Sequence, residues 1–346
     1  PDTWFFKADI AGLGVLGERN IATSIIFMEA PITFSITLTG VILFAGLLLG
    51  LAALHWADLH QDQPLTKYAS VLLHLSLSSG FLALMSGQFM IRYIALDLVG
   101  LFVALSILTS FRESQNLKKF ISVFQILRLG DLFLLAAILL INAYAGTLDI
   151  TRMISAATEM PGASRTWVLF GFVFAILIKL GIWPLGLWQR HTRETVSGVL
   201  FWMSGFLMPV LGFYLLYRIM PILHAGPVSQ NFVLIMSLVL FILIVLVKWQ
   251  TRTRYDRFLH ANGLIGCLVL AAAAIPGSKF FGYYLVGLIF VRLVLILAEE
   301  QEGMFDKFLV LSLPLILNAV FLWVNIHVWT MPFVITWGVF NGLLLL

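Results

Sequence analysis

The sequence predicts an all-α integral membrane protein with about 11 transmembrane helices. Hydrophobic residues fill 61% of the 346 positions and charged residues only 11%, against about 25% charged in an ordinary soluble domain. Apolar runs long enough to cross a bilayer, which takes about 20 helical residues, follow one another along the chain. The polar stretches between them are too short to hold a second folded domain.

The predicted spans begin after a polar N-terminal segment. Residues 1–31 mix charged residues with short apolar pieces, so we expect a surface segment there, followed by a single transmembrane bundle over 32–346. The predicted spans are 32–56, 66–87, 90–110, 118–145, 166–188, 195–220, 229–249, 257–275, 280–298, 304–328 and 330–346.

The basic residues of the loops predict an orientation. When the spans are numbered from residue 32, the loops after even-numbered spans carry only Arg92, Arg152, Arg165, Arg218 and Lys279. The loops after odd-numbered spans carry Lys67, Arg112, Lys118, Lys119, Arg190, Arg193, Arg252, Arg254, Arg257 and Lys307. Because loops rich in Lys and Arg stay on the cytoplasmic or matrix side, we expect the second group there.

A few ionisable residues fall inside predicted spans, where each costs about 2.5–3.5 kcal/mol on insertion scales. Asp97 and Lys179 lie deepest. Pro184, five residues after Lys179, has no N–H and is predicted to break the helix, and Gly181 adds local freedom. A lysine beside such a break is easily desolvated and is suited to exchanging a proton.

Structural explanations of these charges stay open beside the functional one. Arg128 and Asp131 are three residues apart, so they are predicted to form a structural ion pair on one helical face. Lys248 lies at a helix end, from which it could reach the membrane surface, and His260 could be a core histidine. Asp97 and Lys179 could simply form a buried salt bridge that fixes helix packing.

Soluble catalysis has no support in the sequence. A glycine-rich phosphate loop, a paired-cysteine motif and a His-Glu-x-x-His motif are all missing, and Cys267 is the single cysteine. We therefore expect no catalytic centre, cofactor or metal in this chain and no nucleic-acid partner. Whether it belongs to a larger translocase stays open.

Four stretches occur in an order typical of one membrane-protein family. They are the helix around Asp97-Leu-Val-Gly-Leu, the segment Arg128-Leu-Gly-Asp with a later Gly146-Thr-Leu, the segment Lys179-Leu-Gly-Ile-Trp-Pro-Leu with Trp188, and the segment Thr195-Val-Ser-Gly-Val-Leu. Over about 32–270 the chain resembles the antiporter-like membrane subunits of respiratory complex I and of Mrp-type cation/proton antiporters. The likeness is greatest to the fifth mitochondrially encoded NADH dehydrogenase chain and its bacterial counterpart.

The resemblance implies an antiporter-like bundle that conducts protons, or less readily another cation, through buried polar residues. Asp97 would take the role of the family's helix glutamate and Lys179 that of its broken-helix lysine, with Lys248 and His260 further along the path. The implied setting is a larger complex in an energy-coupling membrane, such as the bacterial inner membrane. Its other subunits would include an NADH dehydrogenase-like or an inorganic-carbon-uptake partner. The alternative is a structural membrane anchor that keeps the fold without conducting.

Overall fold

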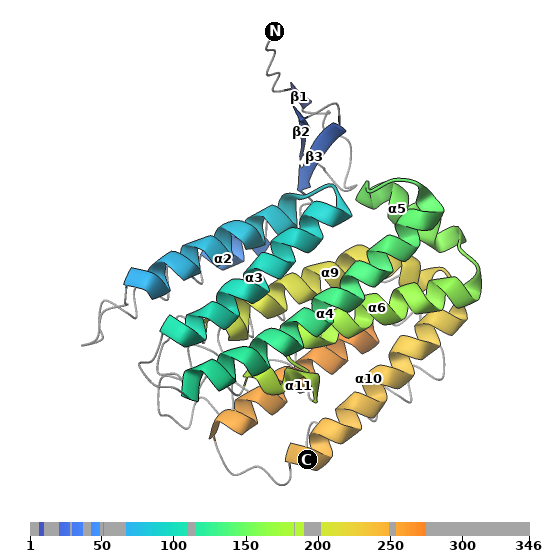
Figure 1. Cartoon of the computed structure of the whole chain (residues 1–346). Coiled ribbons are helices and arrows are strands. Elements are labelled where there is room, and N and C mark those ends of the chain that lie inside the picture. Colours follow the sequence, from blue (N-terminus) through green and yellow to red (C-terminus); the bar gives the residue numbers. More distant parts are fainter. Residues whose placement is uncertain are drawn as a thin grey trace.

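The computed structural model describes residues 7–9, 21–27, 30–36, 43–48, 51, 67–109, 115–182, 184–189, 202–248 and 254–274 (Figure 1). Most of this part is a bundle of long helices, as the sequence predicts. The α-helices are α2 Lys67–Met85, α3 Phe89–Thr109, α4 Gln115–Ala145, α5 Ile150–Glu159, α6 Gly162–Leu180, α9 Met208–His224, α10 Pro227–Lys248 and α11 Arg254–Ala273. A 3-10 turn, η1 Leu185–Leu187, follows α6, and a π-helical turn, η2 Met203–Leu207, leads into α9.

Within the described residues, five helical stretches are long and apolar enough to cross a membrane. They are Phe89–Leu108, Leu117–Ala145, Gly162–Leu187, Met203–His224 and Pro227–Leu246. Shorter apolar stretches occur in α2 and α11. The predicted spans at 66–87, 90–110, 118–145, 166–188, 195–220, 229–249 and 257–275 correspond to these seven helices. The predicted spans at 280–298, 304–328 and 330–346 lie outside the described residues.

The N-terminal part differs from the prediction, because a small sheet reaches into the expected first span. Strands β1 Lys7–Asp9, β2 Ile21–Phe27 and β3 Ala30–Ile36 form an antiparallel sheet in the order β1-β2-β3. Phe27 of β2 pairs with Ala30 of β3. β3 alternates apolar and polar residues and is rich in β-branched ones, a pattern that suits a strand. Helix is described only at 43–48 and 51 in this region.

Helix α5 was missed by the sequence analysis, which treated this stretch as a loop. Asp149 caps its first turn by accepting a hydrogen bond from the backbone N–H of Arg152 at 2.9 Å. One face of α5 buries Ile150, Met153 and Ala157, while the opposite face is exposed. Such a short amphipathic helix is suited to lying along a surface.

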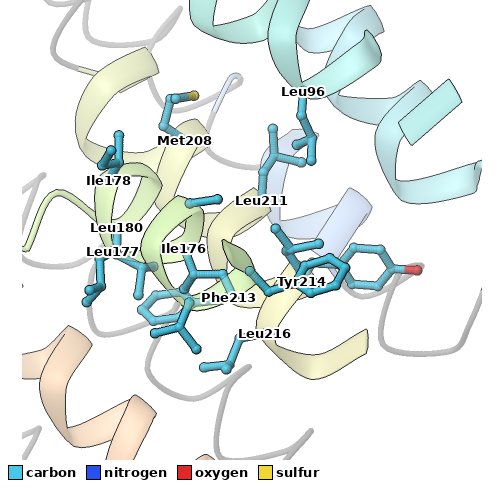
Figure 2. Close-up of a cluster of buried hydrophobic side chains, with 14 of the residues drawn as sticks. Leu96, Ile176, Leu177, Ile178, Leu180, Met208, Leu211, Phe213, Tyr214 and Leu216 are labelled. Atoms are coloured by element: carbon cyan, nitrogen blue, oxygen red, sulfur yellow. The ribbon is translucent and has the colours of Figure 1, made fainter. Parts of the chain in front are cut away.

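The core of the bundle surrounds α9. Every residue from Trp202 to Leu216 is buried, so this helix is central. Figure 2 shows Leu211, Phe213 and Leu216 of α9 beside Ile176 and Leu180 of α6. Helices α3, α4, α6 and α9 are packed in succession, α3 against α4, α4 against α6 and α6 against α9. That packing brings the predicted polar residues of α3, α4 and α6 together.

Candidate functional site

Lys179 forms an ion pair inside the bundle. Its Nζ lies 2.7 Å from Oδ1 of Asp131, and both side chains are only 2% exposed. Lys179 is in the last turn of α6 and Asp131 is in the middle of α4. A pair this well buried pays a large desolvation cost, which its short contact must offset.

A second ion pair lies beside the first. Nη1 of Arg128 on α4 donates a hydrogen bond to Oδ1 of Asp97 on α3. The guanidinium of Arg128 also lies 5.0 Å from the centre of the Phe124 ring, which adds a cation–π contact. The side chains of Arg128 and Asp97 are 34% and 17% exposed, so this pair is less buried than the first.

The partners therefore differ from those that the sequence suggests. The expected pair of Arg128 with Asp131 is wrong, because each of them has its partner on another helix. Asp97 and Lys179 are likewise not paired with each other in this structure. Spacing along one helix says which residues share a face, but the neighbouring helix decides which of them it contacts.

Asp131 lies between Lys179 on one side and helix α3 on the other. While its Oδ1 accepts from Lys179, a Cβ added at Gly100 of α3 would lie 3.6 Å from its Oδ2. Gly100 is three residues after Asp97, so it is on the same face of α3, about one turn away. The charges thus alternate across the three helices in the order Asp97, Arg128, Asp131, Lys179. We call these four residues the charge row.

The break in α6 arises one turn earlier than Pro184. The helix ends at Leu180, and Gly181 takes a left-handed conformation with φ 69°. Its N–H donates to the carbonyl of Ile178, and the N–H of Ile182 donates to the carbonyl of Leu177, as in a glycine-ended helix. Pro184 is not inside α6 but precedes η1. The predicted break near Pro184 is present, with Gly181 as the residue that ends the helix.

The chain after the break folds back against α6. The indole Nε1 of Trp188 donates to the carbonyl of Ile178 at 2.9 Å, and Trp188 is fully buried. Nε2 of Gln189 donates to the carbonyl of Ser204 at 3.1 Å, which ties this segment to the π-helical turn η2. π-helical turns leave irregular backbone groups and often occur at functional sites. One irregular backbone segment therefore lies beside the helix turn that carries Lys179, and Gln189 links it to a second one, η2.

Glycines bring the neighbouring helices close to the charge row. A Cβ at Gly212 of α9 would come within 3.2 Å of the Cβ of Lys179. One at Gly130 of α4 would come within 3.2 Å of Ile178. Small residues at such crossings let membrane helices approach closely. Lys179 is therefore held between α4 and α9, with its ammonium group directed to Asp131.

The other predicted path residues are placed only by their backbone. Lys248 is the last residue of α10, and His260 lies within α11. Their side chains lie outside the described part of the structure. Among the described residues, no three His, Cys, Asp or Glu side chains are grouped so that they could hold a metal ion.

Comparisons with known proteins agree with this architecture. Residues 86–253 match the family model described as NADH:quinone oxidoreductase/Mrp antiporter, TM. That stretch contains all four members of the charge row. NADH-ubiquinone oxidoreductase chain 4 of Metridium senile is 28% identical over 116 residues, which cover 33% of this chain and 23% of that protein.

Two solved membrane complexes contain chains of similar fold. The structure of the Mrp complex from Dietzia sp. DQ12-45-1b has a chain that aligns with a TM-score of 0.68 at 13% identity, covering 88% of this chain and 32% of that one. The membrane-bound sulfane sulfur reductase, an archaeal respiratory membrane complex, has a chain that aligns with a TM-score of 0.73 at 13% identity, covering 91% and 72%. This chain therefore spans less than a quarter of the Metridium relative and about a third of the Mrp chain.

The comparisons confirm the predicted resemblance to antiporter-like membrane subunits and the membrane-bundle fold. The relative found by sequence is chain 4, whereas the sequence analysis compared the chain most closely with the fifth mitochondrially encoded chain. The residue that sequence reasoning assigned least well is Asp131, whereas Gly181 was predicted as part of the helix break and does end α6. The signal of Asp131 was present, because it is a lone carboxylate inside an apolar helix.

Proposed function

We propose that this chain conducts protons as a membrane subunit of a larger energy-coupling complex, and that the charge row carries them. The observation that supports this most is the buried pair of Lys179 and Asp131 at the end of a broken membrane helix. Charged groups at such depth are rare and costly, and they commonly mark ion pathways. The match of residues 86–253 to the NADH:quinone oxidoreductase/Mrp antiporter model supports the same role.

The geometry allows a simple proton exchange within the pair. If the proton on Nζ of Lys179 moves along the 2.7 Å contact to Oδ1 of Asp131, a neutral amine and a neutral carboxylic acid result. Neutral groups cost much less to bury than ions, so the exchanged state is accessible inside the bundle. The pair then loses its electrostatic attraction, which frees each group to exchange a proton with another neighbour.

The less buried pair brings the charge row to the surface of the bundle. Asp97 and Arg128 are partly exposed, whereas Asp131 and Lys179 are almost fully buried. A guanidinium group does not give up its proton in proteins, so the groups of the row that can exchange protons are Asp97, Asp131 and Lys179. We propose that Arg128 alternates between neighbouring carboxylates and thereby controls when Asp131 releases Lys179. Lys248 and His260 would continue the path on α10 and α11.

The test compares charge-removing variants with a surface control. Lys179→Met and Asp131→Asn remove the charge and keep much of the side chain, and Lys118→Gln removes an exposed cation from the start of α4. In inverted vesicles that contain the intact complex, proton transport is followed with a pH-sensitive dye, and abundance with quantitative immunoblotting. We expect the two charge-row variants to lose at least 90% of transport per assembled complex, and Lys118→Gln to keep its transport.

The same measurements decide between conduction and the structural anchor. If the pair only holds α4 and α6 together, transport falls in proportion to abundance and the activity per complex stays constant. Normal transport in both charge-row variants at normal abundance would refute the proposed pathway.

The companion subunits of this chain can be identified by purifying the complex. Both structural neighbours come from multi-subunit complexes, so we propose that this chain also assembles with other subunits. Purification from mild detergent, followed by mass spectrometry, is expected to return companion proteins in fixed ratio. Respiratory or Mrp-type subunits would favour energy conversion, and a zinc carbonic-anhydrase-like protein would favour inorganic-carbon uptake. A chain that purifies alone and transports protons at full rate would exclude the subunit role.

A further inference from the structure

Arg92 is a second buried cation, in addition to Lys179. It lies on α3, at the start of the helix and away from the ion pair of Asp97, and is only 2% exposed. Its Nε donates to the carbonyl of Ala83 at 2.9 Å, and its Nη2 donates to that of Ser86 at 2.6 Å. These carbonyls end α2, so the guanidinium also meets the negative end of that helix dipole. The third nitrogen, Nη1, is buried and has no hydrogen-bond partner.

A second arginine lies beside it. The guanidinium of Arg92 is 5.1 Å from the centre of the Tyr214 ring, and Tyr214 itself donates a hydrogen bond to the carbonyl of Leu84. Arg218 follows Tyr214 by one turn on α9 and is near enough to Arg92 for their charges to interact. Its Nε is also buried without a hydrogen-bond partner. Two cations are thus close enough for their charges to interact, and within the described residues each has a buried N–H group without an acceptor.

No carboxylate in the described part of the chain neutralises these arginines, because the ion pairs found there are those of the charge row. Like charges repel most strongly where water is excluded, and a buried charged donor without an acceptor is costly. An anion between the two arginines would remove both penalties. Planar guanidinium groups match the oxygens of phosphate and carboxylate better than any other side chain.

We propose that Arg92 and Arg218 bind an oxyanion, a phosphate group held between α3 and α9. Nη1 of Arg92 and Nε of Arg218 would donate to it, while Tyr214 keeps Arg92 in place. The site uses none of the charge row, and the inference does not depend on proton conduction.

The position of the site favours the headgroup of an anionic lipid over free phosphate. The turn between α2 and α3 lies beside the amphipathic helix α5, since the N–H of Ile150 donates to the carbonyl of Gly87. In Figure 1 this turn and α5 lie at the same end of the bundle. The ends of membrane-spanning helices meet the lipid headgroups, so a headgroup phosphate is available there. Inorganic phosphate has the same chemistry and serves as the competing source.

The experiment uses the full chain with its companion subunits, purified in a neutral detergent. Phosphatidylglycerol, phosphatidylcholine and inorganic phosphate are the probes, with bound lipid counted by native mass spectrometry and Tm measured for each addition. Arg218→Gln is the main variant, since the side chain of Arg218 has no hydrogen bond to the described residues that would be lost. Arg92→Gln also removes the hydrogen bonds that cap the end of α2. For this variant only the amount of bound lipid is compared, at equal amounts of folded protein. Arg152→Gln, an exposed arginine on α5, is the matched control.

We expect phosphatidylglycerol to bind the wild-type chain and raise its Tm, and Arg218→Gln to weaken that binding at least tenfold. Arg152→Gln should stay within twofold of wild type. Protection by inorganic phosphate without any lipid preference would identify free phosphate as the ligand of the same site. The proposal would be overturned if Arg218→Gln bound phosphatidylglycerol as well as wild type does, or if Arg218→Gln and Arg152→Gln lost binding equally. It would also be overturned if the wild-type chain bound neither phosphatidylglycerol nor inorganic phosphate.

Discussion

At the scale of single residues, burial ranks the two ion pairs of the charge row. Lys179 and Asp131 are each 2% exposed, whereas Arg128 is 34% exposed and Asp97 17%. An ion that loses its partner in a fully buried position has no solvent to replace it. An arginine that loses its partner at the surface of the bundle has room to turn its long side chain toward another polar group. The same neutralising change should therefore have different consequences in the two pairs.

We predict that Asp131→Asn destabilises the chain by about 3–5 kcal/mol, the usual cost of leaving one buried charge unpaired. Asp97→Asn should cost clearly less, because its partner Arg128 is partly exposed and also contacts Phe124. Denaturant unfolding in detergent micelles measures both values. The double variant Asp131→Asn, Lys179→Met serves as the control and should recover much of the lost stability. Equal losses for Asp97→Asn and Asp131→Asn would contradict this ranking.

At the scale of elements, the end of α6 depends on one glycine. Gly181 has φ 69°, and a Cβ there would come within 2.2 Å of the amide group of Gln189. Gln189 is 2% exposed and donates to the carbonyl of Ser204, so it has little freedom to move. Gly146, after α4, offers a comparison. It has φ 63° but nothing within 4 Å of an added Cβ.

We predict that Gly181→Ala destabilises the chain more than Gly146→Ala does. The left-handed backbone alone costs a residue with a Cβ about 1–2 kcal/mol, and this applies to both positions. Only Gly181→Ala must also displace Gln189 and break its link to η2. Thermal unfolding of the two variants in the same detergent measures the difference. Equal Tm values would mean that the segment after α6 is not held by this contact.

The helices and strands differ in how well the sequence predicts them. The bounds of α2, α3, α4, α10 and α11 were predicted within a few residues, because continuous apolar runs between polar stretches determine where a membrane helix begins and ends. Helix α5 was missed because its pattern is amphipathic and short. The strand β2 was missed because residues 1–31 were predicted only as a surface segment. The strand β3 was missed because the apolar run from residue 32 was assigned by hydrophobicity without testing for alternation.

At the scale of the whole molecule, the candidate site could be predicted in its residue content but not in its pairing. Asp97, Arg128, Asp131 and Lys179 stand out because apolar helices carry few charges. Which carboxylate meets which cation depends on the packing of α3, α4 and α6, and spacing within one helix does not contain that information. The cluster of Arg92 and Arg218 depends in the same way on α3 meeting α9, although the two residues are more than 100 positions apart.

The bundle has a defined orientation in the membrane, which its loop charges predict. Loop charges predict that the start of α4 faces the cytoplasm and that α5 lies on the other side of the membrane. Thr151 on α5 and Lys118 near the start of α4 are both exposed. In Figure 1 α5 and the start of α4 lie at opposite ends of the bundle. The single native cysteine, Cys267, is fully buried in α11. It should not react with a membrane-impermeant maleimide in folded protein, so single introduced cysteines can be followed without background.

We predict that Lys118→Cys is labelled in inverted vesicles and protected in right-side-out vesicles, and that Thr151→Cys shows the opposite. The unsubstituted chain is the control and should stay unlabelled until detergent and denaturant expose Cys267. Labelling of both positions from the same side would contradict the alternation of α4 across the membrane. Opposite labelling with the sides reversed would instead keep the bundle and overturn the orientation inferred from the loop charges. In that case Arg92 and Arg218 would lie at the cytoplasmic leaflet, where anionic lipids and free phosphate both reach them.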